Sequence, residues 1–482
     1  MLTLLLILIP ILSSILLFAF GRTHAKAIAF TASVAELAVA FATLNAVQTG
    51  QTTLLNMDLP WLAEIGIRFH INTDGISMLM VLLSTLLMPL IMYASFNRNY
   101  NNLHTLYGLM FLMQGSIIGS FVAMDGFLFY LFWEVALIPI YFIILMWGGN
   151  NRQKITFKFF IYTLFGSLFM LVALIYVYLQ TPDRSFDIQA LYAAGRELPV
   201  TEQAWVMAAF FLAFAIKMPI FPFHTWQPDT YYVAPTPGVM MLSGIMSKMA
   251  TYGLIRWVLP MVPAGIHEYG YILIVLSVIS ILYASFISIV QKDFKYLIAY
   301  SSIAHMGLIS AGIIACNAQS LQGSLMEMLS HGINTVGLFF VFDILFLRMG
   351  TTEMKKLGGI RGLDSSFAFL FFIIVLSVVA LPFTNGFVGE FLLIIGLFQT
   401  NAIAASFAGL SIILGVVYMF RSYQTMMLGE TNQLTAGFTK LTLQEKITLI
   451  IIVTLIIGLG VYPKIVLGIT ESSVQTLLQG IQ

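Results

Sequence analysis

The stretch AWVMAAFFLAFAIKMPIFPFHTWQPD (204–229) decides the fold, because it joins an apolar run to a lysine and two helix-breaking prolines. Residues 204–221 are long enough to cross the hydrocarbon core of a bilayer, about 30 Å thick, as a helix. Lys217 lies inside that run, and Pro219 and Pro222 follow it. Because proline lacks a backbone N–H, we expect the helix to break just after the lysine. The stretch predicts an interrupted transmembrane helix with a charge beside the break.

The whole chain has the composition of a polytopic membrane protein. Of its 482 residues, 59% are apolar and 9% are charged, and the mean hydropathy is +0.94. Soluble domains carry about 25% charged residues, and barrel strands would alternate apolar with polar residues. Since a helical span takes roughly 20 apolar residues, we predict an all-α polytopic membrane protein of about 14 transmembrane helices. The apolar runs lie at 1–20, 28–47, 75–96, 105–123, 126–147, 157–179, 204–221, 233–258, 270–290, 295–315, 322–347, 367–397, 402–428 and 445–468.

The basic residues set the orientation of these spans. With the N-terminus placed outside, the inward loops carry Arg22, Lys26, Arg98, Arg152, Lys154, Lys158, Lys292, Lys295, Arg348, Lys355, Lys356, Arg361, Arg421, Lys440 and Lys446. The outward loops and the C-terminal segment carry Arg68, Arg184, Arg196, Arg256 and Lys464. Fifteen against five is a strong positive-inside bias, so we predict that both termini lie outside. The first run lacks a preceding basic region and is predicted to be a retained span rather than a signal peptide.

The chain is predicted to form a single transmembrane domain, 1–482, because no linker divides it. A second interruption lies in LPFTNGFVGEFLLIIG (381–396), where a proline, an asparagine and two glycines interrupt the twelfth helix. Broken helices 7 and 12, five helices apart, predict two inverted five-helix repeats. The expected parts are N-terminal helices 1–3 (1–104), a first repeat of helices 4–8 (105–258), a second repeat of helices 9–13 (270–428), and the last helix with its tail (445–482).

Several function classes lack their sequence signals. The net charge of +1 leaves no patch for a nucleic acid. Cys316 is the only cysteine, which excludes an internal disulfide and an iron–sulfur cluster held by four thiolates of this chain. We find no GxGxxG, Walker or HExxH motif, so we predict no bound cofactor and no metal in this chain.

Nine of the ionisable residues in the apolar runs are candidates for function. A charge at the bilayer centre costs at least about 2.5–3.5 kcal/mol on insertion scales, so intramembrane charges are functional candidates by default. They are Glu36, Glu134, Lys217, Lys248, His305, Glu327, His331, Asp343 and Glu390. Of these, Glu36 and Asp343 are interpreted as structural, the latter with Arg348 as a neighbouring cation.

Glu134, in FWEVALIP (132–139), is predicted to pair with Lys217. A lysine away from water holds its proton less tightly than in solution, and an adjacent carboxylate restores that hold. Changing the separation of Glu134 and Lys217 would therefore make the lysine release or take up a proton. The alternative is a static ion pair that anchors two helices.

Lys248 lies in SGIMSKMATYGLIRW (243–257), where Gly244 and Ser247 have the size to admit water. The alternative, a lysine that snorkels to the interface, is disfavoured by about ten apolar or small residues on each side.

His305 and His331 are predicted proton relays, because imidazole titrates near neutrality; the alternative is hydrogen-bonded packing. Glu327, one turn before His331, either orients that imidazole or neutralises it. Glu390 is predicted to end the series, with a helix-capping carboxylate as the alternative.

Four segments together carry a family resemblance: FWEVALIP, KMPIFPFHTWQPDTYYVAPTPG (217–238), QKDFKYLIAYSSIAHMG (291–307) and GFVGEF (386–391). In this order they resemble the antiporter-like membrane subunits of proton-pumping NADH:quinone oxidoreductase (respiratory complex I), which are related to Mrp-type antiporter subunits. Within that family the chain is most similar to the chain M group, since the other groups usually have lysine in place of Glu390. The family's HGWLPD-like stretch reads HTWQPD here (224–229).

The resemblance implies proton translocation driven by quinone reduction in partner subunits, with no redox centre in this chain. It implies roles in proton translocation for Glu134, Lys217, Lys248 and Glu390, and relay roles for His305 and His331. Flavin mononucleotide, iron–sulfur clusters and quinone are expected in partners, which include L-like and N-like membrane-arm neighbours, the hydrophilic redox arm and lipids. The expected location is a bacterial cytoplasmic membrane. The alternatives are an Mrp-type Na⁺/H⁺ antiporter subunit and a purely structural membrane-arm subunit.

Overall fold

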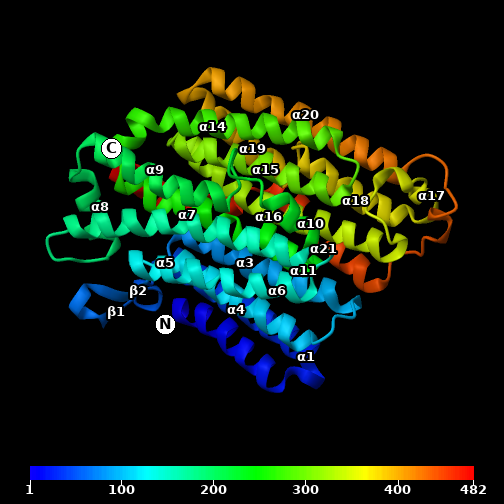
Figure 1. Cartoon of the computed structure of the whole chain (residues 1–482), viewed down its shortest axis with the longest axis horizontal. Helices are drawn as coiled ribbons and strands as arrows, with labels where there is room; N and C mark the ends of the chain where they lie inside the picture. Colours follow the sequence, from blue (N-terminus) through cyan, green and yellow to red (C-terminus); the bar gives the residue numbers. More distant parts are fainter. Residues whose placement is uncertain (482) are drawn as a thin grey trace.

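The computed structural model describes residues 1–481, which form a bundle of long helices lying side by side (Figure 1). The first half contains α1 Leu2–Gln48, α2 Thr52–Leu55, β1 Met57–Leu62, β2 Ile67–Ile71, α3 Gly75–Ala94, α4 Leu103–Val122, α5 Gly126–Val135, α6 Leu137–Trp147, α7 Arg152–Gln180, α8 Ile188–Glu197, α9 Val200–Lys217, α10 Gln227–Val233, α11 Thr236–Met241, α12 Lys248–Gly253 and α13 Leu259–Met261. The second half contains α14 Pro263–Val290, α15 Phe294–Ile314, α16 Ala318–Met349, α17 Ile360–Leu363, α18 Ser365–Val378, α19 Asn385–Thr400, α20 Ala402–Met427, α21 Leu443–Val461 and α22 Lys464–Ile481. The predicted all-α class is confirmed, with one short hairpin added to it.

The apolar runs of the sequence coincide with the helices. α1 contains the first two runs, because its backbone leaves the helical conformation at His24 (φ −124°, ψ 23°) and the chain folds back there. The N-terminal ammonium group of Met1 consequently donates a hydrogen bond of 2.8 Å to the carbonyl of Leu54. Eleven of the described helices, with α1 counted once, are long and apolar enough to cross a membrane. The total of about fourteen spans and the two repeats remain predictions.

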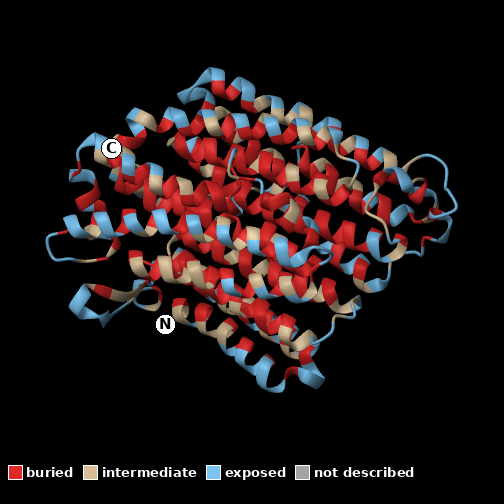
Figure 2. Ribbon diagram, viewed as in Figure 1, coloured by how far each residue is buried: buried red, intermediate tan, exposed pale blue. Residues whose placement is uncertain are grey.

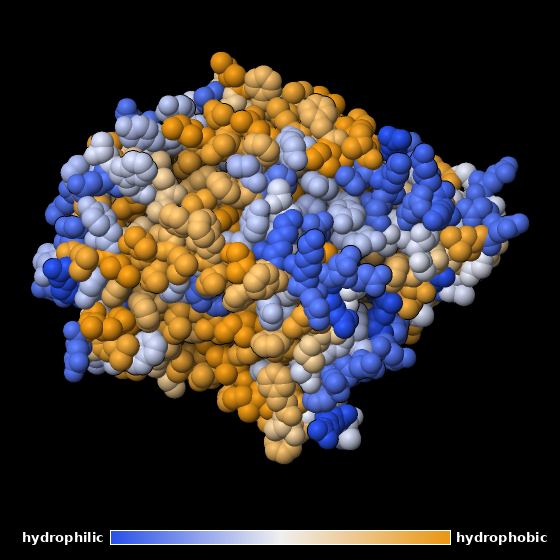
Figure 3. Space-filling view, viewed as in Figure 1, coloured by the Kyte–Doolittle hydropathy of each residue, from blue (hydrophilic) through white to orange (hydrophobic). Residues whose placement is uncertain are grey.

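Inner and outer helices differ in the share of residues that they bury. In α3, α4, α15 and α16, 83–89% of the most apolar window is buried, against 33–39% in α1, α7, α20 and α21. Figure 2 shows this gradient, with buried ribbon in the middle of the bundle and exposed ribbon along its margins. The exposed side chains of the outer helices form a broad hydrophobic surface between two hydrophilic ends (Figure 3). A bilayer is the solvent that such a surface fits.

The two predicted helix breaks are confirmed. α9 ends at Lys217, and the chain turns irregularly until α10 begins at Gln227. The carbonyl of Ile216, near the end of α9, accepts a hydrogen bond of 2.8 Å from the indole N–H of Trp226. Likewise α18 ends at Val378 and α19 begins at Asn385. Non-helical backbone at membrane depth requires such partners inside the protein.

Two further irregularities lie in helices that the sequence led us to expect as continuous. α5 and α6 bend at Ala136, two residues after Glu134. The eighth span contains two π-helical segments, Leu242–Met246 and Leu254–Val258, and Lys248 begins the short α-helix between them. π-Helical turns occur often at functional sites.

A small extramembrane cap covers one end of the bundle. β1 pairs antiparallel with β2, and an isolated bridge joins Asp125 to Asp187 in the segment that leads to α8. Gly66 forms the hairpin turn in the left-handed region (φ +70°), where a Cβ would lie 1.8 Å from the carbonyl oxygen of Arg184. Both termini lie toward this end (Figure 1). The predicted placement of both termini on one face is consistent with this arrangement.

His70 fastens the hairpin to the segment before α8. Its Nδ1 lies 2.8 Å from Oδ2 of Asp187, and its Nε2 lies 3.0 Å from Oδ1 of Asn56. The hydrogen bond with Asp187 raises the pKa of His70 above the usual 6.5. Burial disfavours the ionised form of Asp187, but hydrogen bonds from His70 and from the backbone of Gln189 outweigh it and lower the pKa of Asp187.

These shifts predict a pH window for the cap. The contribution of His70 is complete below its unfolded-state pKa and is lost as the pH rises through its raised folded-state pKa. The contribution of Asp187 is complete above its unfolded-state pKa and is lost as the pH falls through its lowered folded-state pKa. Raising the pH from about 6 to about 9 should therefore weaken the cap. For a partly exposed pair, we expect the protection of the hairpin against hydrogen–deuterium exchange to fall by roughly two- to fivefold.

Hydrogen–deuterium exchange of residues 57–71, corrected for the intrinsic exchange rate at each pH, measures this change. His70→Gln keeps a donor without a titrating proton and should abolish the pH dependence of protection. Equal pH dependence in the wild type and in His70→Gln would contradict the prediction.

Candidate functional site

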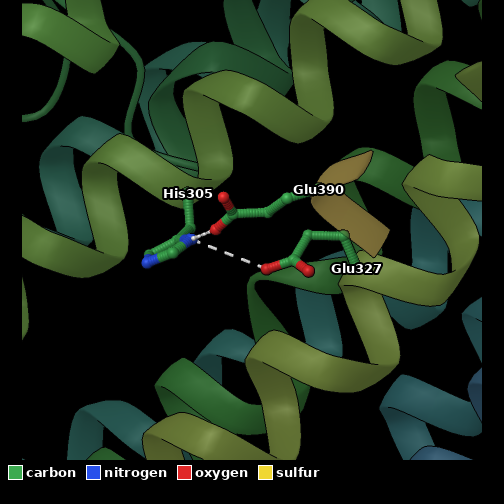
Figure 4. A group of neighbouring side chains, drawn as sticks. All are labelled: His305, Glu327 and Glu390. Carbon is green, nitrogen blue, oxygen red and sulfur yellow. Dashed lines mark ion pairs between the residues drawn. The ribbon is translucent and has the colours of Figure 1, made fainter. Parts of the chain in front are cut away.

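Three ionisable side chains meet in the second half of the bundle (Figure 4). Nδ1 of His305, on α15, lies 3.2 Å from Oε1 of Glu390 on α19 and 3.5 Å from Oε1 of Glu327 on α16. Both carboxylates are almost fully buried. The second oxygen of Glu327 has no hydrogen-bond partner among the described residues. One imidazole thus lies between two carboxylates that face the same nitrogen.

Small residues bring the helices of this group together. A Cβ on Gly389 would lie 2.6 Å from Oε2 of Glu327 and 2.8 Å from its Cα. At Gly323 and Gly396 a Cβ would likewise collide with the backbone of the facing helix, at 2.5 Å and 2.4 Å. α16 and α19 therefore pack backbone to backbone, as small residues allow in membranes. That close contact places Glu390 beside His305 and Glu327.

Lys248 and His331 form a second, fully buried contact. Nζ of Lys248 donates a hydrogen bond of 2.6 Å to the carbonyl of Ser243 and lies 2.7 Å from Nδ1 of His331. The Ser243 carbonyl belongs to the first π-helical segment of the eighth span. Because Lys248 is 0% exposed, snorkelling to the interface is ruled out. If Lys248 is an ammonium group, Nδ1 of His331 accepts from it and the imidazole is neutral, so a proton can pass between the two side chains.

The two contacts adjoin each other. The ring centroids of His305 and His331 lie 5.7 Å apart. Nε2 of His331 is buried and has no hydrogen-bond partner in the described part of the chain. Lys248, His331, His305 and Glu390 therefore follow one another through the centre of the bundle. The sequence predicted Glu390 at the end of this series but not the order of the two histidines. We call these four residues, together with Glu327, the central line.

The predicted ion pair of Glu134 with Lys217 is not formed. Nζ of Lys217 donates to the carbonyl of Trp133 at 3.3 Å and lies 3.8 Å from the centroid of the Trp133 ring, a cation–π contact. Oε1 of Glu134 is buried without a hydrogen-bond partner among residues 1–481. The bend at Ala136 and the aromatic ring account for the separation: the indole next to Glu134 receives the ammonium group. A static anchoring pair, the structural alternative, is absent as well.

The small residues beside Lys248 make contacts within the protein. Gly244 lies against the facing helices, because a Cβ there would meet Val336 at 2.8 Å and Leu87 at 3.3 Å. Its small size serves helix packing. Ser247 donates to the carbonyl of Ser243. Admission of water beside Lys248 stays a prediction.

Asp343 pairs with Arg98 rather than with Arg348, at 2.6 Å, and Arg348 forms its own pair with Glu445 at 2.7 Å. Both partners lie far along the chain, on segments whose approach the sequence does not reveal. The structural interpretation of Asp343 is compatible with this pair. Glu36 is 0% exposed, and neither of its carboxylate oxygens has a hydrogen-bond partner among the described residues.

A small cavity adjoins Glu390 and His305. Its volume of about 10 Å³ is at the lower limit for one water molecule. Ser411 and Tyr418 line it, and the hydroxyl of Tyr418 lies 3.3 Å from that of Ser301. Polar side chains therefore continue from Glu390 toward α20.

Sequence reasoning missed the groups that hold the central line in place. The hydroxyl of Ser377, on α18, lies 3.0 Å from Oδ1 of Asn334 and 2.6 Å from Oδ1 of Asn385, and this shared contact ties the broken twelfth helix to α16. The Ser243 carbonyl and the Trp133 ring were missed because a backbone group and an aromatic side chain carry no charge signal. Only the asparagine of the break, Asn385, was noticed in the sequence.

His305, Glu327 and Glu390 also form a set that can hold a metal ion, since one ligand atom of each lies within 4.8 Å of the others. One imidazole and two carboxylates suit a divalent cation. The imidazole already lies within ion-pair distance of both carboxylates. The absence of a metal from this chain therefore remains a prediction.

The fold and the site together define a polytopic helical membrane protein with a line of ionisable side chains through its core. Residues 123–415 match the family described as NADH:quinone oxidoreductase/Mrp antiporter, transmembrane. The chain is 40% identical, over 87% of its length and 84% of the relative's, to NADH-quinone oxidoreductase subunit M of Rickettsia typhi. It is 37% identical to the subunit M of Rhodobacter capsulatus over 95% of this chain and 91% of that one.

Solved structures agree with these matches. Respiratory complex I from Thermus thermophilus with bound NADH contains a chain that superposes with a TM-score of 0.92 at 28% identity, over 100% of both chains. The Mrp complex of Dietzia sp. shares the fold at a TM-score of 0.87 and 20% identity, over 100% of this chain and 98% of that one. The chain belongs to the NADH:quinone oxidoreductase/Mrp antiporter membrane family, as the resemblance in the sequence indicated.

The packing of α16 on α19 yields a prediction. Gly389→Ala places a methyl group against Glu327 and should force the two helices apart, at a cost of about 1–3 kcal/mol typical of overpacking. The thermal transition of the purified protein should fall accordingly. Gly409→Ala, on α20, meets nothing within 4 Å and serves as the matched control. Equal thermal transitions for the two variants would contradict the close approach.

Proposed function

We propose that the chain is a proton-translocating membrane-arm subunit of an NADH:quinone oxidoreductase, and that its central line carries the protons. The continuity from Lys248 through His331 and His305 to Glu390 is the observation that supports this most directly. The names of the relatives support the assembly. Electron transfer, with flavin, iron–sulfur clusters and quinone, belongs to partner subunits. We place the protein in a bacterial cytoplasmic membrane with both termini outside, among L-like and N-like neighbours.

The chemistry of the central line suits proton transfer. Each member gains or loses one proton without breaking a covalent bond, and each lies next to a group that can accept that proton. Lys248 delivers a proton to Nδ1 of His331 across 2.7 Å. The unpartnered Nε2 of His331 is the atom from which the proton leaves toward His305. His305 then passes it to Glu390, whose carboxylate faces Nδ1 at 3.2 Å.

Glu134 and Lys217 control the supply of protons in this proposal. The two residues form no ion pair in the structure. The ammonium group of Lys217 lies against Trp133, and Oε1 of Glu134 has no hydrogen-bond partner among residues 1–481. No hydrogen bond or ion pair among residues 1–481 links Lys217 to Lys248, so water or a movement has to bridge that step. Approach of Glu134 would strengthen the hold of Lys217 on its proton, and separation would release it.

Replacing Lys248 or Glu134 with alanine tests the proposal in the assembled complex. Positioned proton-transfer groups typically raise a reaction rate by about 10²–10⁴-fold. The rate of proton-coupled quinone reduction should therefore fall by at least about tenfold in both variants. The measurements are NADH:quinone turnover and proton pumping in proteoliposomes. Retained flavin and iron–sulfur content shows that each complex has assembled.

Lys355→Ala removes an exposed cation from the same chain and should leave both rates unchanged. Normal pumping in the Lys248 and Glu134 variants would overturn the proposal. If the chain has a purely structural role, the complex should keep pumping protons after Glu134 and Lys217 are both replaced by apolar residues.

The Mrp-type alternative is supported by the shared family and is tested separately. If the chain works as a complex I subunit, the purified chain alone in proteoliposomes should show no sodium-driven proton flux. Flux driven by a sodium gradient, without NADH or partner subunits, would identify an Na⁺/H⁺ antiporter instead. Glu390→Gln is the matched control for any flux observed. Because both kinds of translocation would require this carboxylate, flux through the protein should disappear in this variant.

A further inference from the structure

A wide hollow lies at the bend of α1, at the end of the bundle away from the hairpin. Its volume is about 950 Å³, within the range of about 300–1,000 Å³ typical of small-molecule sites. Residues 22–27 at the bend form one side, and residues 100–105, which lead into α4, form the other. The proton-translocating residues lie elsewhere in the bundle, so their proposed role leaves this hollow unexplained.

The hollow is basic. Arg22, His24, Lys26 and His104 line it, and no carboxylate is among its lining residues. Nζ of Lys26 donates to the carbonyl of Phe96 at 2.7 Å, which leaves two of its three N–H groups available. The side chains of Arg22, His24 and His104 make no hydrogen bond or ion pair within residues 1–481. Two cations, Arg22 and Lys26, and two imidazoles thus line the hollow without an internal counter-charge, and such a group of donors attracts an anion.

Helix packing fixes the shape of the hollow. A Cβ on Gly21 would lie 2.9 Å from Cβ of His104, and a Cβ on Gly108 would lie 2.7 Å from the ring of Phe18. These glycines let α1 and α4 approach closely on the membrane side of the hollow. The basic groups are therefore carried by two packed helix ends rather than by a free loop.

Exposed aromatic side chains flank the basic groups. Phe20, two residues before Arg22, is 71% exposed, and Phe30, on the returning half of α1, is 37% exposed. Figure 3 shows a hydrophilic patch at the lower end of α1 next to a hydrophobic surface. Phe20 and Phe30 lie on the two spans that meet at the bend, so an apolar surface adjoins the basic groups on the membrane side. The combination fits a ligand with a negative head and apolar tails.

We propose that this basic hollow binds the phosphate headgroup of an anionic phospholipid from the inward leaflet, with the acyl chains against α1. The predicted orientation places the hollow on the face that carries most of the loop cations. Anionic lipids attract basic residues at such a surface. A soluble phosphate would satisfy the cations but would leave the flanking phenylalanines unexplained. The inference does not depend on proton translocation.

Photo-crosslinking from inside the hollow identifies the occupant. Thr23 is exposed and lines the hollow, so it is replaced by p-benzoylphenylalanine in the intact complex. The complex is reconstituted in vesicles of phosphatidylglycerol and phosphatidylcholine, illuminated, and the adduct is identified by mass spectrometry. We expect phosphatidylglycerol adducts to exceed the lipid's share of the bilayer, with about fivefold enrichment for each contributing basic side chain.

Substitutions in the same background test the charges. Arg22→Gln and His104→Gln should each lower the ratio of phosphatidylglycerol to phosphatidylcholine adducts. Lys355→Gln removes a cation that lines none of the described hollows and should leave the ratio unchanged. NADH:quinone turnover reports whether each complex remains intact, and the adduct of the otherwise unchanged complex gives the primary result whether or not the variants assemble.

Three results would overturn the proposal. The first is an adduct ratio equal to the bilayer composition. The second is an adduct to a neighbouring polypeptide, which would make the hollow a subunit interface. The third is an unchanged ratio of phosphatidylglycerol to phosphatidylcholine adducts in Arg22→Gln and His104→Gln complexes that retain NADH:quinone turnover, which would show that these side chains do not select the lipid.

Discussion

Hydrocarbon forms no hydrogen bonds, and the whole architecture depends on that constraint. A helix that breaks inside the membrane must pass its freed backbone groups to other parts of the protein. The indole of Trp226 does so for the carbonyl of Ile216 at the end of α9. Ser377 and Asn385 tie α18 and α19 to α16 at the other break. The breaks survive because polar partners are built around them.

The same constraint explains why charges and irregular backbone coincide. Lys217 ends α9, Lys248 follows a π-helical segment, and Glu390 lies five residues into the helix that follows the second break. A buried ammonium group needs acceptors, and irregular or aromatic-flanked backbone supplies them: the carbonyl of Ser243 for Lys248 and that of Trp133 for Lys217. Glu390 is held differently, by the close packing of α16 and α19. Regular helices would have left both lysines without a carbonyl to bind.

Sequence reasoning reached the fold and most of the central line because both rest on strong local signals. Apolar runs locate the helices, and prolines locate the break after Lys217. A charged residue within an apolar run can be recognised from the sequence alone as a candidate for function. The partner of each buried charge could not be predicted in the same way, because it lies on a segment that is distant in the sequence. Arg98 lies 245 residues before its partner Asp343, and nothing local favours it over Arg348. The separation of Glu134 from Lys217 depends on the bend at Ala136 and on the orientation of one indole ring, neither of which has a sequence pattern.

The partners also divide the buried charges into two kinds. Near the ends of the bundle, carboxylates pair with arginine: Asp343 with Arg98, and Glu445 with Arg348. Guanidinium does not lose its proton in proteins, so these pairs are fixed charges that hold helices together. In the central line, Glu327 and Glu390 face His305 and Lys248 faces His331, while Lys217 lies against the ring of Trp133. Every group there that carries a positive charge can also give it up. The two arginine pairs are thus charges that stabilise the bundle, whereas the side chains of the central line are ones that can gain and lose a proton.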